Sequence, residues 1–145
     1  MEYTLLELNN LTNKMSKKIK LGFSIYLSGD LGSGKTTFSR FLIQNLFKSK
    51  GKRKPEVTSP TYNIVQYYNV SNKFIIAHYD LYRMKNSIDI DQVGLYELEE
   101  KVCSIIEWPK LIKQKNKNRI EINFMYTKFK NKRNVKIKYF GSAKE

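Results

Sequence analysis

The chain has 145 residues, of which 41% are hydrophobic, and a formal net charge of +14. This length favours one domain with a sizeable core, over residues 1–145. No apolar run approaches the roughly 20 residues of a membrane span, and the start, MEYTLLELNN, has no signal-peptide pattern. The single cysteine, Cys103, has no internal disulfide partner. Together these features favour a cytoplasmic protein.

The positive charge comes from 22 lysines and only five arginines, which is typical of a global residue bias. Five of these basic residues crowd residues 110–119, KLIKQKNKNR, with no acid among them. Two interpretations stay open for this stretch. Lysine runs are usually solvated faces, which we favour, but the same stretch would also suit tRNA or an acidic protein surface.

Hydrophobic spacing predicts a helix over residues 9–20 and a buried strand over residues 22–29. A second helix is expected over residues 35–51, with Phe38, Phe41, Leu42 and Leu46 on its inner face and Gly51 near its end. Later expectations are strands at 62–70 and 73–82, an acidic and mostly helical segment at 88–102, a strand at 103–108, a turn or helix start at Pro109, and a hairpin of 119–126 with 134–141. This order predicts an α/β fold of three layers, with a mixed, mainly parallel sheet and a C-terminal antiparallel hairpin.

The segment SGDLGSGKTT contains a complete G-x-x-x-x-G-K-[ST] phosphate loop, placed between a predicted strand and a predicted helix. Glycines let successive backbone N–H groups approach phosphate oxygens, and the helix start adds a positive dipole end. Lys35 supplies a charge for the β and γ phosphates, and Thr36 offers a hydroxyl to Mg²⁺. The expected nucleotide-binding residues are Gly29, Asp30, Leu31, Gly32, Ser33, Gly34, Lys35, Thr36 and Thr37.

Two acids end apolar strands, Asp80 in FIIAHYD and Glu107 in CSIIE. Beside a phosphate loop, such acids are candidates for holding Mg²⁺ together with Thr36 and for positioning the attacking water. We favour Asp80 for the metal and Glu107 for the water. Thr61, in the stretch SPT, is the candidate sensor of the γ phosphate, although a plain strand-entry turn explains SPT equally well. Lys35, Glu107, Asp80 and Thr61 are thus the catalytic candidates.

The nucleotide class follows from what the chain lacks. No Asn-Lys-x-Asp guanine reader is present, because none of its Asn-Lys pairs continues to Asp two residues later. A small-molecule kinase usually needs several arginines, and only Arg83 is well placed. An ATPase that acts on a partner therefore fits best. The alternatives are a small nucleotide-dependent kinase and a basic RNA-binding module with a structural nucleotide.

Five segments occur in a characteristic order: GDLGSGKTTFSR, SPTYNIVQYY, HYDLYRM, GLYELEE and IIEWP. Together they resemble the bacterial TsaE (YjeE) family, P-loop ATPases of tRNA threonylcarbamoyladenosine biosynthesis, most strongly over residues 21–109. The resemblance implies a P-loop NTPase-like fold, binding of ATP and Mg²⁺, and slow ATP hydrolysis by the protein alone. It also implies work with TsaD and TsaB, the pair that modifies adenosine 37 of tRNA, with any tRNA contact left open.

By the same resemblance, Lys35 and Thr36 serve phosphate and metal, Thr61 lies in a switch-like loop, and Asp80 and Glu107 are the acids of the HxDLYR and EWP motifs. Trp108 would lie near the nucleotide, although a core position suits it equally well. His78 stays undecided. The adenine-reading residues are not visible, although the N-terminal helix is a candidate contributor. The lysine-rich segment 110–117 departs from the family pattern and lacks a proline before the hairpin.

Overall fold

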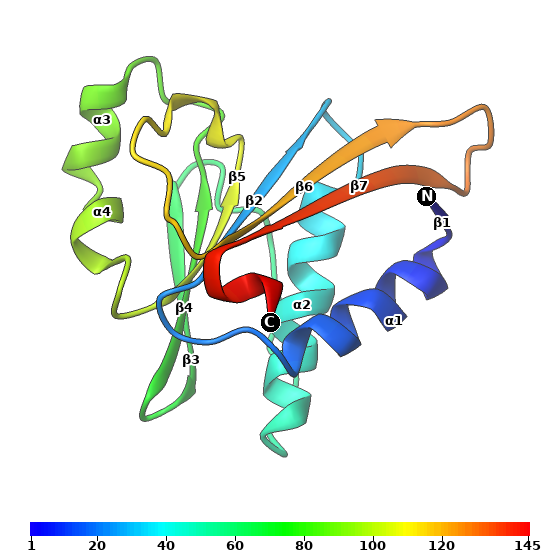
Figure 1. The fold of residues 1–145 in the computed structure, drawn as a ribbon, viewed down its shortest axis with the longest axis horizontal. Coiled ribbons are helices and arrows are strands. Elements are labelled where there is room, and N and C mark those ends of the chain that lie inside the picture. Colours follow the sequence, from blue (N-terminus) through cyan, green and yellow to red (C-terminus); the bar gives the residue numbers. More distant parts are fainter.

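A computed structural model describes all residues 1–145 and contains one seven-stranded sheet with helices on both faces (Figure 1). The helices are α1 (Leu5–Ser16), α2 (Lys35–Ser49), α3 (Ser87–Gln92) and α4 (Leu95–Leu98), with short 3₁₀ turns at Pro109–Leu111 and Gly141–Lys144. The strands are β1 (Glu2–Tyr3), β2 (Ser24–Gly29), β3 (Val65–Ser71), β4 (Phe74–Asp80), β5 (Cys103–Glu107), β6 (Arg119–Tyr126) and β7 (Arg133–Phe140).

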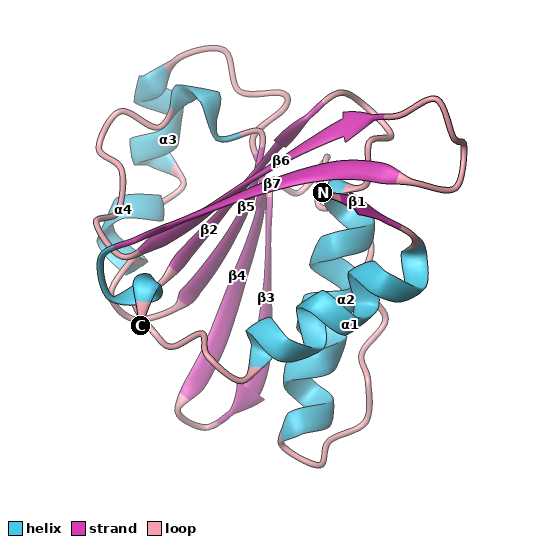
Figure 2. Ribbon diagram, turned by 45° about the vertical axis from the view of Figure 1, so that its right-hand side comes forward, coloured by secondary structure: helices cyan, strands magenta, loops and turns pink.

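The strand order is β1-β7-β6-β2-β5-β4-β3 (Figure 2). The four central strands β6, β2, β5 and β4 run parallel to one another. Antiparallel pairs close both sides, β3 with β4 and β7 with β6. The predicted mixed sheet and its C-terminal hairpin are confirmed. The sheet is not mainly parallel in its pairing, because three of its six neighbouring strand pairs are antiparallel. The phosphate-loop strand β2 lies at the centre of the sheet. Because β2, β5 and β4 are parallel neighbours, their carboxyl ends meet at one edge of the sheet.

Alternation along β2 divides the core between the two faces of the sheet. Ile25 and Leu27 join the cluster that packs under α1 and α2, whereas Tyr26 joins the cluster under α3 and α4. Helix α2 contributes Phe38, Leu42 and Leu46 to the first cluster, as its spacing predicted, although Phe41 is only partly buried. Cys103 is fully buried in this same cluster. No helix has the length and apolar character needed to cross a membrane.

Two helical predictions need correction. The N-terminal helix begins at Leu5 rather than residue 9, because Thr4 and Glu7 form a capping box, and it ends at Ser16. Ile19 is nevertheless buried, through the loop that follows. The acidic segment 88–102 is two short helices, separated where Gly94 adopts φ +75°. A left-handed residue ends an α-helix, which explains the break.

Candidate nucleotide site

The phosphate loop links the end of β2 to the start of α2, and all three of its glycines have positive φ. Gly29 has φ +147°, and a Cβ there would lie 2.6 Å from Ser33 Oγ and 2.7 Å from the Phe124 carbonyl oxygen. Gly34 has φ +119° and precedes Lys35 without any side-chain cap on the first N–H groups of α2. These donors and the helix dipole therefore face the loop, as an anion site requires.

Lys35 is turned back onto the phosphate loop. Its Nζ donates to the carbonyl oxygens of Gly29 (2.6 Å) and Asp30 (2.8 Å) and lies 4.0 Å from the centre of the Trp108 ring. Burial lowers the pKa of this ammonium, and the carboxylates of Glu107 and Asp80 oppose that shift. An ammonium held by two neutral carbonyls can exchange them for phosphate oxygens, which carry the charge the carbonyls lack.

Glu107, the last residue of β5, connects the sheet to the start of α2. Its Oε1 accepts from Thr36 Oγ1 at 2.8 Å. Its Oε2 lies 2.6 Å from His78 Nε2 and 3.4 Å from Ser39 Oγ. The carboxylate is buried, with only 2% of the residue exposed, so these contacts replace water almost completely. They meet the demand that a buried carboxylate be hydrogen-bonded.

Asp80, the last residue of β4, connects the sheet to the loop that carries SPT. Its Oδ2 accepts from Thr61 Oγ1 at 2.9 Å and Ser59 Oγ at 3.1 Å, and its Oδ1 accepts from the Tyr82 N–H at 3.0 Å. Asp80 and Glu107 are register partners on adjacent parallel strands. The two acids therefore reach the same edge of the sheet, as the sequence analysis expected.

A pocket of about 280 Å³ lies over this edge and collects most of the predicted residues. Its lining comprises Leu31, Gly32, Gly34, Lys35, Thr36, Thr37, Ser59, Thr61, Asp80, Tyr82, Glu107 and Trp108. Lys35 is the one cationic side chain among them. Three predicted loop residues lie elsewhere: Gly29 and Asp30 border a separate hollow behind the loop, and Ser33 is fully buried.

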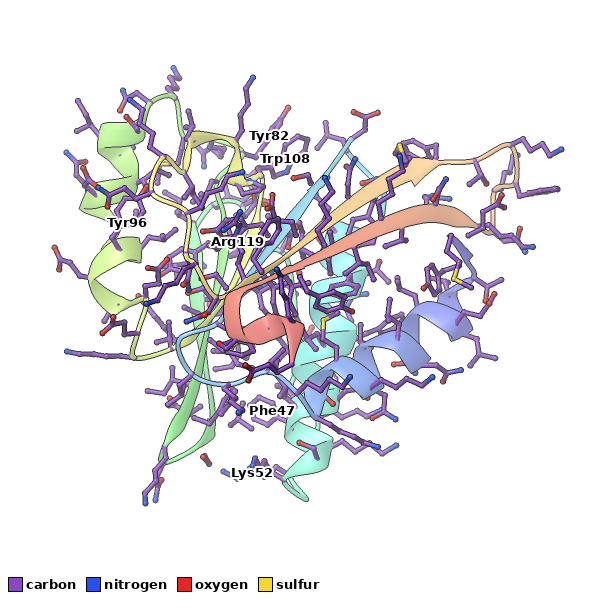
Figure 3. The ribbon with its side chains drawn as sticks, viewed as in Figure 1. Phe47, Lys52, Tyr82, Tyr96, Trp108 and Arg119 are labelled. Atoms are coloured by element: carbon purple, nitrogen blue, oxygen red, sulfur yellow. The ribbon has the colours of Figure 1, made fainter.

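Trp108 and Tyr82 form one wall of this pocket. Their ring centres lie 4.8 Å apart (Figure 3). Trp108 is half-buried and has φ +61°, an uncommon value for a residue other than glycine. Its backbone N–H donates to Leu27 O at 3.1 Å. The indole lies over Lys35, beside the phosphate loop, and also packs against the core cluster under α3 and α4. Both interpretations of Trp108 therefore describe part of its position.

A second pocket, of about 420 Å³, continues from the phosphate loop on the side of the N-terminal helix. It shares Gly32, Gly34 and Thr37 with the first pocket. Its other lining residues come from the phosphate loop (Ser33), the end of β1 and the start of α1 (Tyr3, Thr4, Leu5, Leu6 and Leu8), and the tip of the β6–β7 hairpin (Lys130, Asn131 and Arg133). The hollow is thus mainly built by segments from the two ends of the chain.

No cluster of three or more His, Cys, Asp or Glu side chains forms a ready-made metal cage. Thr36, Asp80 and Glu107 nonetheless share the 280 Å³ pocket. Mg²⁺ in nucleotide sites is usually held by one or two protein oxygens, water and phosphate. The three residues therefore fit a cation that arrives with a triphosphate.

Four contributors were missed or left open by the sequence analysis. His78 and Ser39 contact Glu107, while Ser59 contacts Asp80. Tyr82 forms part of the pocket wall. The spacing of two between His78 and Asp80 on a strand already places both on one face, which is the signal that would have selected His78.

Comparison with known proteins agrees with this architecture. The family model for Threonylcarbamoyl adenosine biosynthesis protein TsaE matches residues 4–135. A crystal structure of Bacillus subtilus YdiB superposes with a TM-score of 0.72 at 26% identity, over 97% of this chain and 86% of that one. The similarity therefore extends over nearly the whole fold.

Two relatives carry the name tRNA threonylcarbamoyladenosine biosynthesis protein TsaE. The protein from Borreliella burgdorferi is 39% identical over 104 residues, 70% of this chain and 71% of the relative. The protein from Rickettsia felis is 36% identical over 107 residues, which are 74% of this chain but only 60% of that longer relative. With the family model matching residues 4–135, the chain belongs to the TsaE family of threonylcarbamoyl adenosine biosynthesis proteins.

Proposed function

We propose that the chain binds ATP with Mg²⁺, hydrolyses it, and thereby supports threonylcarbamoyladenosine modification of tRNA at adenosine 37. The observation that carries this proposal is the meeting of Lys35, Thr36, Asp80 and Glu107 around one pocket beside an uncapped helix start. Family membership supports the pathway, since the relatives are named for it.

The phosphate loop would hold the β and γ phosphates. The N–H groups at the start of α2 point into it, and Lys35 Nζ would leave the carbonyls of Gly29 and Asp30 to meet phosphate oxygens. Bound Mg²⁺ would supply charge neutralisation for phosphoryl transfer. Thr36 would offer it a hydroxyl oxygen, whose hydrogen is already directed at Glu107 Oε1.

The contacts favour a division of roles between the acids that reverses the one expected from the sequence. Glu107 bonds directly to Thr36, so it belongs to the metal side of the site. Asp80 bonds to Thr61 and Ser59, so it fixes the loop that would face the γ phosphate and its attacking water. Both carboxylates would act mainly on the transition state, by holding groups in place for it.

The base of ATP would occupy the 420 Å³ pocket next to the loop. Tyr3, Leu5, Leu6 and Leu8 give it apolar walls near the phosphate loop. Because this hollow shares three loop residues with the phosphate pocket, one nucleotide can span both. In this proposal the N-terminal helix contributes Leu5, Leu6 and Leu8 to the base pocket, in line with its place as a candidate contributor in the sequence.

Dependence on TsaD and TsaB belongs to the same proposal. Lys35 is the one cation lining the phosphate pocket, whereas rapid phosphoryl transfer usually needs further positive charge on the transition state. Arg83 lies over the Tyr62 ring at 5.2 Å and does not line the pocket. This lack of further positive charge would make hydrolysis by the isolated chain slow. Turnover would be faster with the partners.

The test combines binding and product analysis. Calorimetry with Mg²⁺-ATP should show one site per chain, and a phosphate-release assay should give free phosphate, slowly alone and faster with TsaD and TsaB. No phosphorylated acceptor should form, which separates the ATPase from the kinase alternative. Absence of ATP binding would overturn the proposal, and tight RNA binding with no hydrolysis under any condition would favour the RNA-binding module.

A further inference from the structure

His78 is a fully buried histidine on β4 with one directed contact. Its Nε2 lies 2.6 Å from Glu107 Oε2, and its Nδ1 is buried without a partner. A hydrogen on Nδ1 would be buried without an acceptor, so the contact fits the neutral tautomer that carries its hydrogen on Nε2. His78 then donates to Glu107.

The other carboxylate oxygen faces the phosphate loop. Glu107 Oε1 accepts from Thr36 Oγ1 at 2.8 Å. A hydroxyl has one hydrogen and two lone pairs, so a hydrogen directed at Glu107 leaves the lone pairs of Thr36 free for a cation. The side chains form a chain of contacts in the order His78, Glu107, Thr36.

The remaining contact on Glu107 is weaker. Ser39 Oγ lies 3.4 Å from Oε2 and also donates to Lys35 O at 2.9 Å, so its hydrogen has a nearer acceptor. His78 is therefore the main group that fixes Oε2. Without it, the carboxylate could rotate away from the plane in which Oε1 meets Thr36.

We infer that His78 is a positioning residue, which holds the Glu107 carboxylate so that Thr36 presents its oxygen to a divalent cation. The inference rests on the proposed nucleotide site, and it assigns to His78 no contact with nucleotide or metal. Groups that orient metal ligands from behind typically contribute 10- to 100-fold to metal affinity.

The experiment measures metal coupling rather than turnover. Affinity for a non-hydrolysable ATP analogue is determined by calorimetry, once with Mg²⁺ and once with EDTA, and the ratio of the two is the Mg²⁺ gain. His78→Leu removes the donor and should reduce this gain about tenfold or more while leaving the affinity in EDTA unchanged. His78→Gln places an amide N–H near the position of Nε2 and should restore most of the gain.

Ile76→Val is the matched control, because Ile76 is fully buried two residues away on the same face of β4 and belongs to the apolar core cluster. It should leave the Mg²⁺ gain at the wild-type value. If His78→Leu does not fold, His78→Asn gives the same comparison, since its amide is too short to reach Glu107.

The results separate the role of His78 from the proposed nucleotide binding. An unchanged Mg²⁺ gain in His78→Leu or His78→Asn would overturn the inference. A reduced Mg²⁺ gain that His78→Gln fails to restore would also overturn it, because either result would show that His78 only fills space in the core. A wild-type chain that binds no analogue at all would instead refute the proposed function. The two failures are therefore distinguishable.

Discussion

Asp80 and Glu107 lie directly opposite each other on the parallel strands β4 and β5, and each is the last residue of its strand. The phosphate loop leaves β2, the next strand in the sheet, at the same edge. Parallel strands deliver their carboxyl ends together, so two acids from separate motifs reach one pocket. The acids differ in their contacts: Glu107 bonds to Thr36, and Asp80 bonds to Thr61.

Lys35→Ala should weaken ATP binding about tenfold or more and abolish hydrolysis. A charge-assisted contact in a desolvated site is worth about 1.5–3 kcal/mol, which corresponds to such a loss. Calorimetry measures the affinity, and circular dichroism checks the fold. Lys48→Ala is the control, because Lys48 is an exposed lysine on the same helix. Equal ATP affinity in wild type and Lys35→Ala would refute the assignment of Lys35.

ATP should bind more tightly than GTP. The chain has no Asn-Lys-x-Asp guanine reader. The hollow proposed for the base also has apolar walls, which include Leu5, Leu6 and Leu8. Competition between the two nucleotides for one site gives the preference directly. Equal or tighter GTP binding would contradict both this prediction and the place proposed for the base.

The basic stretch 110–119 should behave as a solvated surface. Lys110 and Lys113 are exposed. The two ion pairs of this stretch join Lys115 and Arg119 to Glu121 and leave Lys110 and Lys113 out. Lys110→Glu combined with Lys113→Glu should therefore leave the salt dependence of the assembly with TsaD, TsaB and tRNA unchanged. The control is Lys52→Glu with Lys54→Glu, two exposed lysines in the loop after α2.

That prediction has a quantitative alternative. Each phosphate neutralised by a lysine contributes roughly 0.7–0.9 to the slope of log affinity against log salt. A slope that falls by this amount per lysine in the 110–119 variant, and not in the control, would assign the stretch to an RNA contact.

Cys103 should be inert in the folded protein. It is fully buried, and burial raises the pKa of its thiol to about 12. Only the thiolate reacts with disulfide reagents, so at pH 8 the native chain should be labelled far more slowly than the chain in denaturant. Time courses with an aromatic disulfide reagent measure both rates. Equal rates would show that β5 opens readily or that Cys103 lies outside the core.

Most elements of the fold could be predicted from the sequence, because the patterns that indicate them lie within short segments of the chain. The phosphate loop between a strand and a helix, the apolar stripe of α2 and the alternating hairpin were all readable from spacing alone. The start of α1 was also readable, since TLLE is a Thr-x-x-Glu capping box that places the helix at Leu5. Strand β1 has only two residues and exists through its pairing with β7, which no local pattern predicts.

The sequence predicted the positions of the two acids at the ends of their strands, but it did not predict their hydrogen-bond partners. Asp80 and Glu107 were found because each ends an apolar strand. Their hydrogen-bond partners depend on which elements lie side by side, so the sequence order of the motifs could not assign Thr36 to Glu107 or Thr61 to Asp80. The same holds for His78, whose partner is 29 residues away in the chain.

We expect the two strand-end acids, Asp80 and Glu107, to serve ATP hydrolysis rather than protein stability or nucleotide binding alone. Asp80→Asn and Glu107→Gln keep the size of each side chain and remove its charge. Both variants should lose most of the hydrolysis, because the removed interaction acts mainly on the transition state. Asp80→Asn should retain most of the ATP affinity, whereas Glu107→Gln should retain the affinity measured in EDTA and lose part of the Mg²⁺ gain, since its carboxylate orients Thr36. Lys48→Ala serves again as the control.

The decisive measurement is single-turnover ATP hydrolysis in the presence of TsaD and TsaB, beside a Mg²⁺ titration. Asp80→Asn should lose hydrolysis at every Mg²⁺ concentration. Glu107→Gln should lose hydrolysis and require more Mg²⁺ than the wild type, because its carboxylate orients Thr36. Wild-type hydrolysis rates in both variants, at the wild-type Mg²⁺ requirement, would show that the two acids have no part in hydrolysis.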